Sequence, residues 1–190
     1  MKFEFACTSF LGYSHCGSVT ADGYGSIELT DTEVDTLMNL IRANGSSDIE
    51  GICLQENYPD LYEKLDEAYR DAAREATIAH WYMEGFREGV YEYDEDELIE
   101  YCSENHGFEF SYDEEDYTDE DGEVDEDALY DDRHEAFSEW LEDFVVGLDT
   151  DKMVEFLTEH MNADVDTTDL ELDYQVKIPD EIIRLANEDK

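Results

Sequence analysis

The chain has few basic residues. It contains 11 Lys and Arg against 55 Asp and Glu, which gives a formal net charge of −44 over 190 residues. Proteins that bind DNA or RNA by neutralising phosphates need clustered Lys and Arg, and anionic membrane surfaces repel a chain of this charge. The scarcity of cations therefore argues against direct nucleic-acid binding and against binding at a membrane surface.

Long apolar runs and paired cysteines are also missing. No run of about 18 apolar residues occurs, so we expect no membrane-spanning helix. The first five residues, Met-Lys-Phe-Glu-Phe, do not form the uninterrupted apolar stretch of a secretory signal. No C-x-x-C pair occurs, which favours free thiols in a reducing compartment. We therefore expect a cytoplasmic protein with four separate cysteines: Cys7, Cys16, Cys53 and Cys102.

The composition does not fit a disordered chain, because disorder requires low hydrophobicity as well as high charge. Apolar residues make up 41% of the sequence and aromatic residues 13%, and only two prolines occur. That is enough material for a core, although self-repulsion weakens the compact state at low ionic strength. We expect a single domain over 1–190, with a split into 1–112 and 127–190 as the alternative.

The N-terminal segment is predicted to form strands. Apolar and polar residues alternate over 3–7, as in a half-buried strand. Residues 21–25, Ala-Asp-Gly-Tyr-Gly, favour a hairpin loop that leads into a short strand over 26–29. Two later segments, 107–112 and 169–176, show the same alternation, and the last of them could rejoin the N-terminal strands.

Helical periodicity begins after these first strands. Thr30 and Glu33 have the spacing of a capping box, and Gly45 suits the end of this first helix. Pro59 suits the first turn of a long helix that runs to about Phe86. Strands near both ends with helices between them predict an α+β fold, with a mainly antiparallel sheet and about five to six helices. Further helices are expected after Asp94, over about 127–146, after Thr150 and after Pro179.

A low-complexity acidic segment covers residues 113–126. Like charges at this density cannot be buried, so we expect a mobile loop. Between Arg87 and Arg133 the sequence has 22 Asp and Glu and no Lys or Arg. Tyrosines in this zone could be core or interface residues, and both alternatives stay open. The loop carboxylates that we expect to contact a partner are Asp119, Glu120, Asp121, Glu123 and Asp125.

The most informative pattern is a row of carboxylates at four-residue intervals on the helix expected over 127–146. Four residues rise about 6 Å along an α-helix, so five such residues form a slowly drifting row roughly 24 Å long. Phosphates of one DNA strand recur every 3.4 Å of axis, roughly, and lie further apart along the sugar–phosphate path. The row can therefore imitate a phosphate backbone. Its members are Asp127, Asp131, Glu135, Glu139 and Asp143.

The long helix that begins at Pro59 repeats this spacing, but there the pattern is typical of an ordinary solvated helix face. Bases interleave with its acids, and we expect Lys64 to pair with Asp60. Arg70 should pair with Asp66 in the same way. The carboxylates at four-residue spacing are Glu63, Glu67, Asp71 and Glu75.

Metal sites and catalytic motifs are weakly supported. An EF-hand alignment with Gly122 at its sixth position puts Tyr117 and Ala128 at the two anchor positions, where acidic ligands are needed. Cys102 and His106 form a single close pair, whereas structural zinc sites usually show two such pairs. The common nucleophile, zinc-protease and phosphate-binding motifs do not occur. We expect no enzyme activity, no metal and no cofactor.

The sequence therefore favours a non-enzymatic acidic protein that occupies the nucleic-acid-binding surface of a basic partner. DNA-mimic inhibitors of restriction or CRISPR systems and acidic immunity proteins of nuclease toxins act in this way, and the likeness here lies in charge and carboxylate spacing alone. Two alternatives stay open. The acidity could be an adaptation to molar salt, or the loop over 113–126 could buffer cations or dock a basic partner. The acidic residues are unevenly distributed along the chain, which favours the DNA-mimic hypothesis over salt adaptation.

Overall fold

The computed structural model describes residues 1–15, 17–117 and 124–188. Its chain contacts divide into two compact units. Unit 1 contains Met1–His80 and Asp166–Lys190, and unit 2 contains Trp81–Val165. The expectation of one domain, or of a split into 1–112 and 127–190, stays a prediction.

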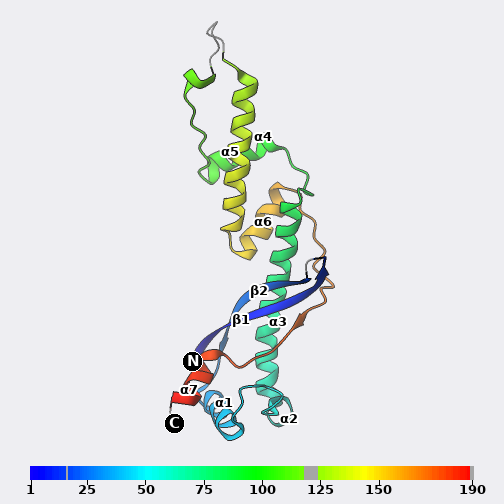
Figure 1. The fold of residues 1–190 in the computed structure, drawn as a ribbon, viewed down its shortest axis with the longest axis vertical. Helices are drawn as coiled ribbons and strands as arrows, with labels where there is room; N and C mark the ends of the chain where they lie inside the picture. The colour runs from blue at the N-terminus through cyan, green and yellow to red at the C-terminus, as the bar shows by residue number, and fades with distance from the viewer. Residues whose placement is uncertain (16, 118–123, 189–190) are drawn as a thin grey trace. The chain divides into compact units, whose positions relative to one another are not determined.

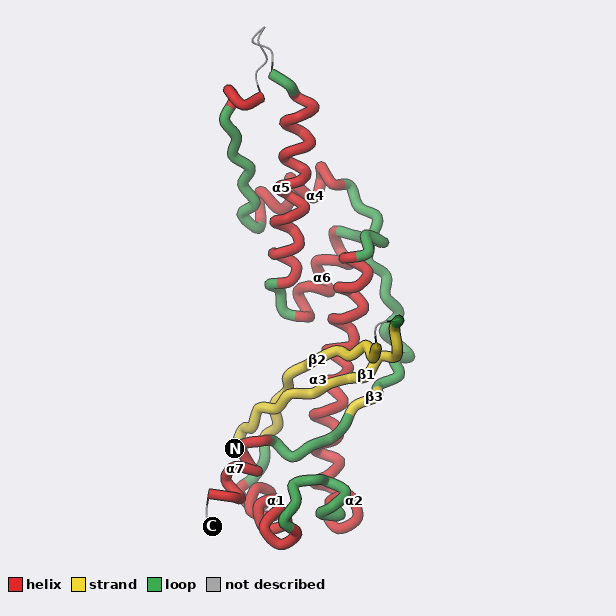
Figure 2. The backbone as a smooth tube through the Cα atoms, viewed as in Figure 1, coloured by secondary structure: helices red, strands yellow, loops and turns green. Residues whose placement is uncertain are grey.

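A three-stranded antiparallel sheet in unit 1 confirms the α+β prediction. Strands β1 (Lys2–Ser14) and β2 (Gly17–Glu28) form a long hairpin, and the short strand β3 (Asp173–Tyr174) pairs with the other edge of β1 (Figure 2). The strand order is β2-β1-β3, so the C-terminal segment rejoins the N-terminal strands as expected. The strand expected over 169–176 is reduced to the two residues of β3.

The prediction of a hairpin loop at 21–25 is wrong, because these residues lie inside β2. The hairpin pairing continues to Ser14 opposite Gly17, so the strands connect there. The glycines of β2 serve packing: a Cβ on Gly23 would lie 2.8 Å from the carbonyl oxygen of Ala72 on α3 (Pro59–Arg87). A Cβ on Gly25 would lie 2.5 Å from Cζ of Phe5. Close approach of the strand to its neighbours, and not a turn, requires these glycines.

The first helix, α1 (Asp31–Asn44), begins and ends as the sequence predicts. The Thr30 N–H donates to Oε2 of Glu33 at 2.6 Å, and the Glu33 N–H donates to Oγ1 of Thr30 at 3.3 Å. The backbone hydrogen bond from Thr30, followed by the bond from Lys64, holds the pKa of Glu33 below its usual range. Gly45 ends the helix in the left-handed conformation with φ of 65°.

The core of unit 1 lies between the sheet, α1, α3 and the C-terminal helix α7 (Asp180–Glu188) (Figure 1). Phe5 stacks on Tyr69 of α3 with ring centroids 4.1 Å apart. Arg42 of α1 donates to the carbonyl oxygen of Ala186 at 3.0 Å, which ties α1 to α7. The fully buried aliphatic residues of this core include Leu29, Leu37, Leu54, Leu65, Ile178 and Ile182.

Unit 2 contains the later helices. They are α4 (Glu95–Asn105), the short 3₁₀ helix η1 (Glu114–Tyr117), α5 (Glu126–Val146) and α6 (Thr150–His160). The helix expected after Thr150 begins one residue earlier, at Thr150 itself, because Asp149 accepts from the Lys152 N–H at 3.0 Å and caps α6. Seven α-helices occur within 1–15, 17–117 and 124–188, and the four-residue α2 (Leu54–Asn57) is one that the sequence did not indicate.

The strand predicted over 107–112 is wrong, since this segment forms no strand in the structure. Its aromatic residues pack against α5 instead of entering a sheet. The ring of Phe108 lies 5.1 Å from that of Phe137 and 5.4 Å from that of Trp140. Alternation alone cannot distinguish a paired strand from an extended segment that lays aromatic side chains along a helix.

Candidate acidic binding surface on α5

The five carboxylates predicted on α5 all lie on the exposed side of this helix. We call them the carboxylate row: Asp127, Asp131, Glu135, Glu139 and Asp143. The residues that α5 buries are Phe137, Leu141 and Val145, which are at most 3% exposed. The periodicity of α5 therefore separates a packed apolar stripe from an acidic face, with about 6 Å of rise between successive carboxylates of the row.

Within the described part of the chain, no basic side chain neutralises the charge of the row. Among the residues that the structure describes, no Lys, Arg or His forms an ion pair with any carboxylate of the row. Like charges four residues apart on a helix each cost roughly 0.2–0.5 kcal/mol. The row therefore carries a stability cost that its own surroundings do not offset.

A histidine brings further carboxylates to α5. Nδ1 of His134 lies 3.0 Å from Oε2 of Glu95, and its Nε2 lies 3.3 Å from Oδ1 of Asp96, both at the start of α4. The His134 side chain is 13% exposed, so these contacts form where α4 and α5 pack together. The start of α4 thus adds acidic side chains beside the row.

Tyr130 lies at this junction. Its ring centroid is 4.0 Å from that of His134. Partial desolvation raises the pKa of Tyr130, and four neighbouring carboxylates raise it further: Asp96, Glu95, Asp94 and Asp131. The sequence predicts a helix after Asp94, but it does not indicate that α4 and α5 meet here. A histidine inside a run of acids is the signal that could have indicated such a meeting point.

The predicted loop carboxylates are only partly described. Asp125 is the N-cap of α5, and its Oδ1 accepts from the Ala128 N–H at 3.0 Å. Nearby, the Tyr117 hydroxyl donates to Asp132 at 2.6 Å, which raises the pKa of Tyr117. The mobility expected for 113–126 stays a prediction. The other four loop carboxylates lie outside the described residues: Asp119, Glu120, Asp121 and Glu123.

On α3, by contrast, bases do engage the acidic residues of unit 1. The ion pair between Arg70 and Asp66 is confirmed. The predicted partner of Lys64 is wrong, because Lys64 lies 3.0 Å from Glu33 of α1, whose carboxylate the capping box already orients. The four carboxylates at four-residue spacing on α3 are exposed, as those of α5 are, and none of them forms an ion pair within the described residues. They differ from the row in having Lys64, Arg70 and Arg74 interleaved along their helix.

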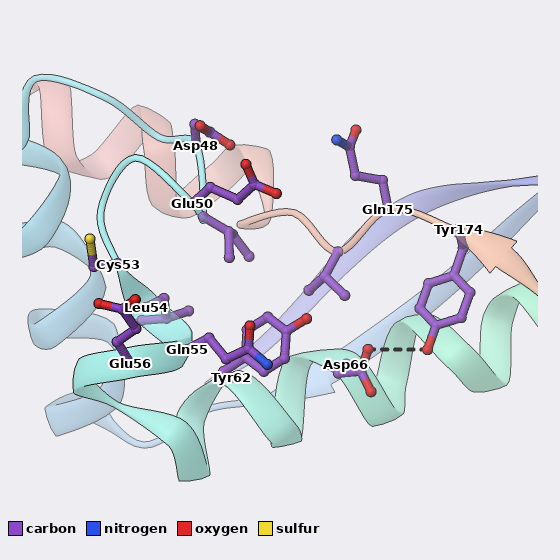
Figure 3. A pocket seen from close by; sticks show the side chains of 12 residues that line it. Asp48, Glu50, Cys53, Leu54, Gln55, Glu56, Tyr62, Asp66, Tyr174 and Gln175 are labelled. Atoms are coloured by element: carbon purple, nitrogen blue, oxygen red, sulfur yellow. Dashed lines mark hydrogen bonds between the residues drawn. The ribbon is translucent and has the colours of Figure 1, made fainter.

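A separate concave site in unit 1 lies between α3, β3 and the segment around α2, with a volume of about 530 Å³. Figure 3 shows Tyr62 and Asp66 on α3, and the Tyr174 hydroxyl donates to Asp66 at 3.1 Å. Asp48 and Glu50 come from the loop before α2. Within the described ranges, no three His, Cys, Asp or Glu side chains are grouped so that they could hold a metal ion. We therefore interpret this site as an acidic surface depression filled by solvent.

The three described cysteines differ sharply in exposure. Cys53 is exposed, whereas Cys7 and Cys102 are buried and free. Burial raises the pKa of the Cys7 thiol, and it raises that of Cys102 to about 11. Because the thiolate is the reactive form, both buried thiols are protected by inaccessibility and by protonation.

We therefore predict one fast-reacting thiol in a Cys16→Ser variant, in which the cysteine outside the described residues is removed. Titration with a thiol-specific chromogenic reagent at neutral pH should label Cys53 at once, and Cys7 and Cys102 only after a denaturant is added. A further Cys53→Ser substitution should abolish the fast phase. Rapid labelling of two thiols in the folded protein would contradict the buried positions of Cys7 and Cys102.

Comparisons with known proteins give no match to a family model, a curated protein or a solved structure. In the described part of the chain, no helix is long and apolar enough to cross a membrane.

Proposed function

We propose that this protein is a non-enzymatic acidic binding protein that occupies the nucleic-acid-binding surface of a basic partner. The observation that carries the proposal is the carboxylate row on α5: five exposed carboxylates at regular spacing, without an ion pair among the described residues. The start of α4, where Glu95 and Asp96 contact His134 of α5, extends this negative surface.

Electrostatics explains how such a surface would act. A regularly spaced series of fixed negative charges, which turns by about 40° around α5 at each step, attracts a basic groove over distances of about a Debye length and raises the association rate. On contact, carboxylates can replace phosphates as ion-pair partners of Lys and Arg. The row is about 24 Å long, which corresponds to seven or so phosphates of one DNA strand. No catalytic step is needed, because inhibition follows from occupancy alone.

The stability cost of the row also supports use by a partner. Bases interleave along α3, while α5 has Arg133 as its only Lys or Arg, and that side chain forms no ion pair within the described residues. A solvated helix face without a role gains from interleaved bases, as α3 does. On α5 the repulsion is retained, and a cationic partner would relieve it.

Affinity capture from host lysate tests the proposal. The tagged full-length chain is used as bait at low salt and at about 0.5 M salt, where surface charges are largely screened, with and without excess duplex DNA. We expect enrichment of a basic nucleic-acid-binding protein that is released by salt and displaced by DNA. Retention of nothing specific at either salt concentration would remove the support for this function and favour salt adaptation or cation buffering.

Charge reversal locates the binding surface. A variant with three neighbouring carboxylates of the row reversed to Lys should lose the captured partner, because these positions become cations. A control variant with three carboxylates of α3 reversed to Lys changes the net charge by the same amount and should capture the partner like the wild type. Loss of capture in both variants would show that net charge, and not the row, is responsible. The row variant carries Asp131→Lys, Glu135→Lys and Glu139→Lys, and the α3 control carries Glu63→Lys, Glu67→Lys and Asp71→Lys.

A further inference from the structure

A pocket lined by several aromatic side chains lies in unit 2 near the start of the carboxylate row. It has a volume of about 480 Å³ and lies between the first turns of α5 and the segment that follows α4. This volume is in the range of pockets that enclose a large side chain or a small ligand. The side chains that matter for the argument are Phe108, Phe110, Tyr112, Leu129, Tyr130 and Arg133.

Two of these aromatic side chains are about half exposed. Tyr112 is 52% exposed and Tyr130 is 49% exposed. The ring of Tyr112 stacks with that of Phe110 at a centroid distance of 5.8 Å. Aromatic side chains with an apolar body and a polar tip are enriched where proteins meet other proteins. Their grouping around a concavity indicates a place for another apolar group.

The pocket meets the start of the acidic face through Tyr130. This residue lies three positions after Asp127 of the row, so the two side chains are neighbours on the helix surface. Glu126 adds a carboxylate to the pocket lining itself. A partner segment that places Lys or Arg along the row therefore carries its neighbouring side chains to the mouth of the pocket. Charge complementarity thus selects a basic segment for this position.

Arg133 disfavours a cationic side chain inside the pocket. It lines the pocket, is only partly exposed, and forms no ion pair within the described residues. A Lys or Arg of the partner would meet a like charge there. An aromatic ring would instead gain a cation–π contact with the guanidinium and apolar contacts with Phe108 and Leu129.

We propose that this pocket anchors one aromatic side chain of the basic partner, flanked in the partner's sequence by Lys or Arg residues that contact the carboxylate row. The inference rests on the proposed function. It adds a specific apolar contact to an otherwise electrostatic surface, as in interfaces where a central buried anchor is surrounded by a polar rim.

Two synthetic peptides of equal charge test this inference against the full chain. They are Lys-Lys-Gly-Trp-Gly-Lys-Lys and the same peptide with Ser in place of Trp, and NMR titration of the ¹⁵N-labelled protein gives their affinities. We expect the Trp peptide to bind at least 10-fold more tightly. Its chemical-shift changes should include the amides of Leu129, Tyr130 and Arg133.

Two variants separate the pocket from nonspecific aromatic contacts. Tyr130→Ser should abolish the preference for the Trp peptide, whereas Tyr13→Ser, at an 86% exposed tyrosine of β1, should leave it unchanged. A preference that persists in Tyr130→Ser would overturn the assignment to this pocket.

The remaining outcomes distinguish failure of the inference from failure of the proposed function. Both peptides could bind equally, with an affinity that falls with salt and is lost in the charge-reversed row variant. That result would overturn the aromatic anchor and leave the proposed acidic binding surface supported. Failure of both peptides to bind at low salt would overturn the anchor together with the proposed function.

Discussion

Neutralising three carboxylates of the row should make the protein more stable and at the same time strongly weaken partner binding. The variant carries Asp131→Asn, Glu135→Gln and Glu139→Gln, which preserve side-chain size. Each of the four successive pairs in the row contains at least one of these residues, so all four repulsions disappear. At roughly 0.2–0.5 kcal/mol per pair, the free energy of unfolding should rise by about 1–2 kcal/mol at low salt. Urea unfolding followed by circular dichroism measures this change.

The same variant should bind the captured partner at least about 100-fold more weakly. The loss of three charge contacts at about 1 kcal/mol each corresponds to this factor. The matched control neutralises Glu63, Glu67 and Asp71 on α3 and should retain full affinity. The stability gain of the neutralised variant should shrink at about 0.5 M salt, because salt already screens the repulsion. If the neutralised variant is less stable than the wild type, or binds the partner equally well, the hypothesis that the row serves binding at a cost in stability is wrong.

Gly25→Ala should destabilise unit 1 by about 2–3 kcal/mol, in the range of overpacked cores. The added Cβ would lie 2.5 Å and 2.8 Å from two ring atoms of Phe5 and 3.2 Å from Cβ of Ala72. The Phe5 ring cannot move aside easily, because it is 7% exposed and stacked on Tyr69. Intrinsic propensity acts in the opposite direction, since replacing Gly by Ala within a strand gains roughly 0.5–1 kcal/mol. A net loss therefore reports the steric contact itself.

Urea unfolding of Gly25→Ala and of Ser26→Ala measures this contact. Ser26 is the next residue of β2 and is exposed, so its substitution should change the free energy of unfolding by less than about 0.5 kcal/mol. Equal stability of Gly25→Ala and the wild type would show that β2 does not approach its neighbours as closely as the structure indicates.

Local patterns determine much of this fold. The capping box at Thr30 and Glu33, the long helix from Pro59 and the opposite faces of α5 all follow from residues within a few positions of each other. Such signals depend on hydrogen bonds and periodicity inside one element, so a sequence is enough to recognise them. The exposure of the carboxylate row belongs to this class, because the buried stripe of α5 fixes the face that remains outside.

The features that the sequence did not reveal depend on contacts between distant segments. Gly23 and Gly25 look like turn residues until α3 and Phe5 are placed against β2. Lys64 pairs with Glu33, 31 positions away, in preference to its helical neighbour. His134 stands inside a run of acids, but its two carboxylate partners become visible only when α4 packs on α5. In each case the decisive neighbour is a tertiary one.

Competition with duplex DNA for the captured partner tests the central claim most directly. A fluorescently labelled duplex bound to that partner is titrated with the wild-type chain, and anisotropy and native electrophoresis record which complexes remain. We predict complete release of the duplex by the wild type and by the α3 charge-reversal control, and no release by the variant reversed at Asp131, Glu135 and Glu139. A stable ternary complex of chain, partner and duplex would contradict the claim, because the chain would then bind the partner away from its nucleic-acid-binding surface.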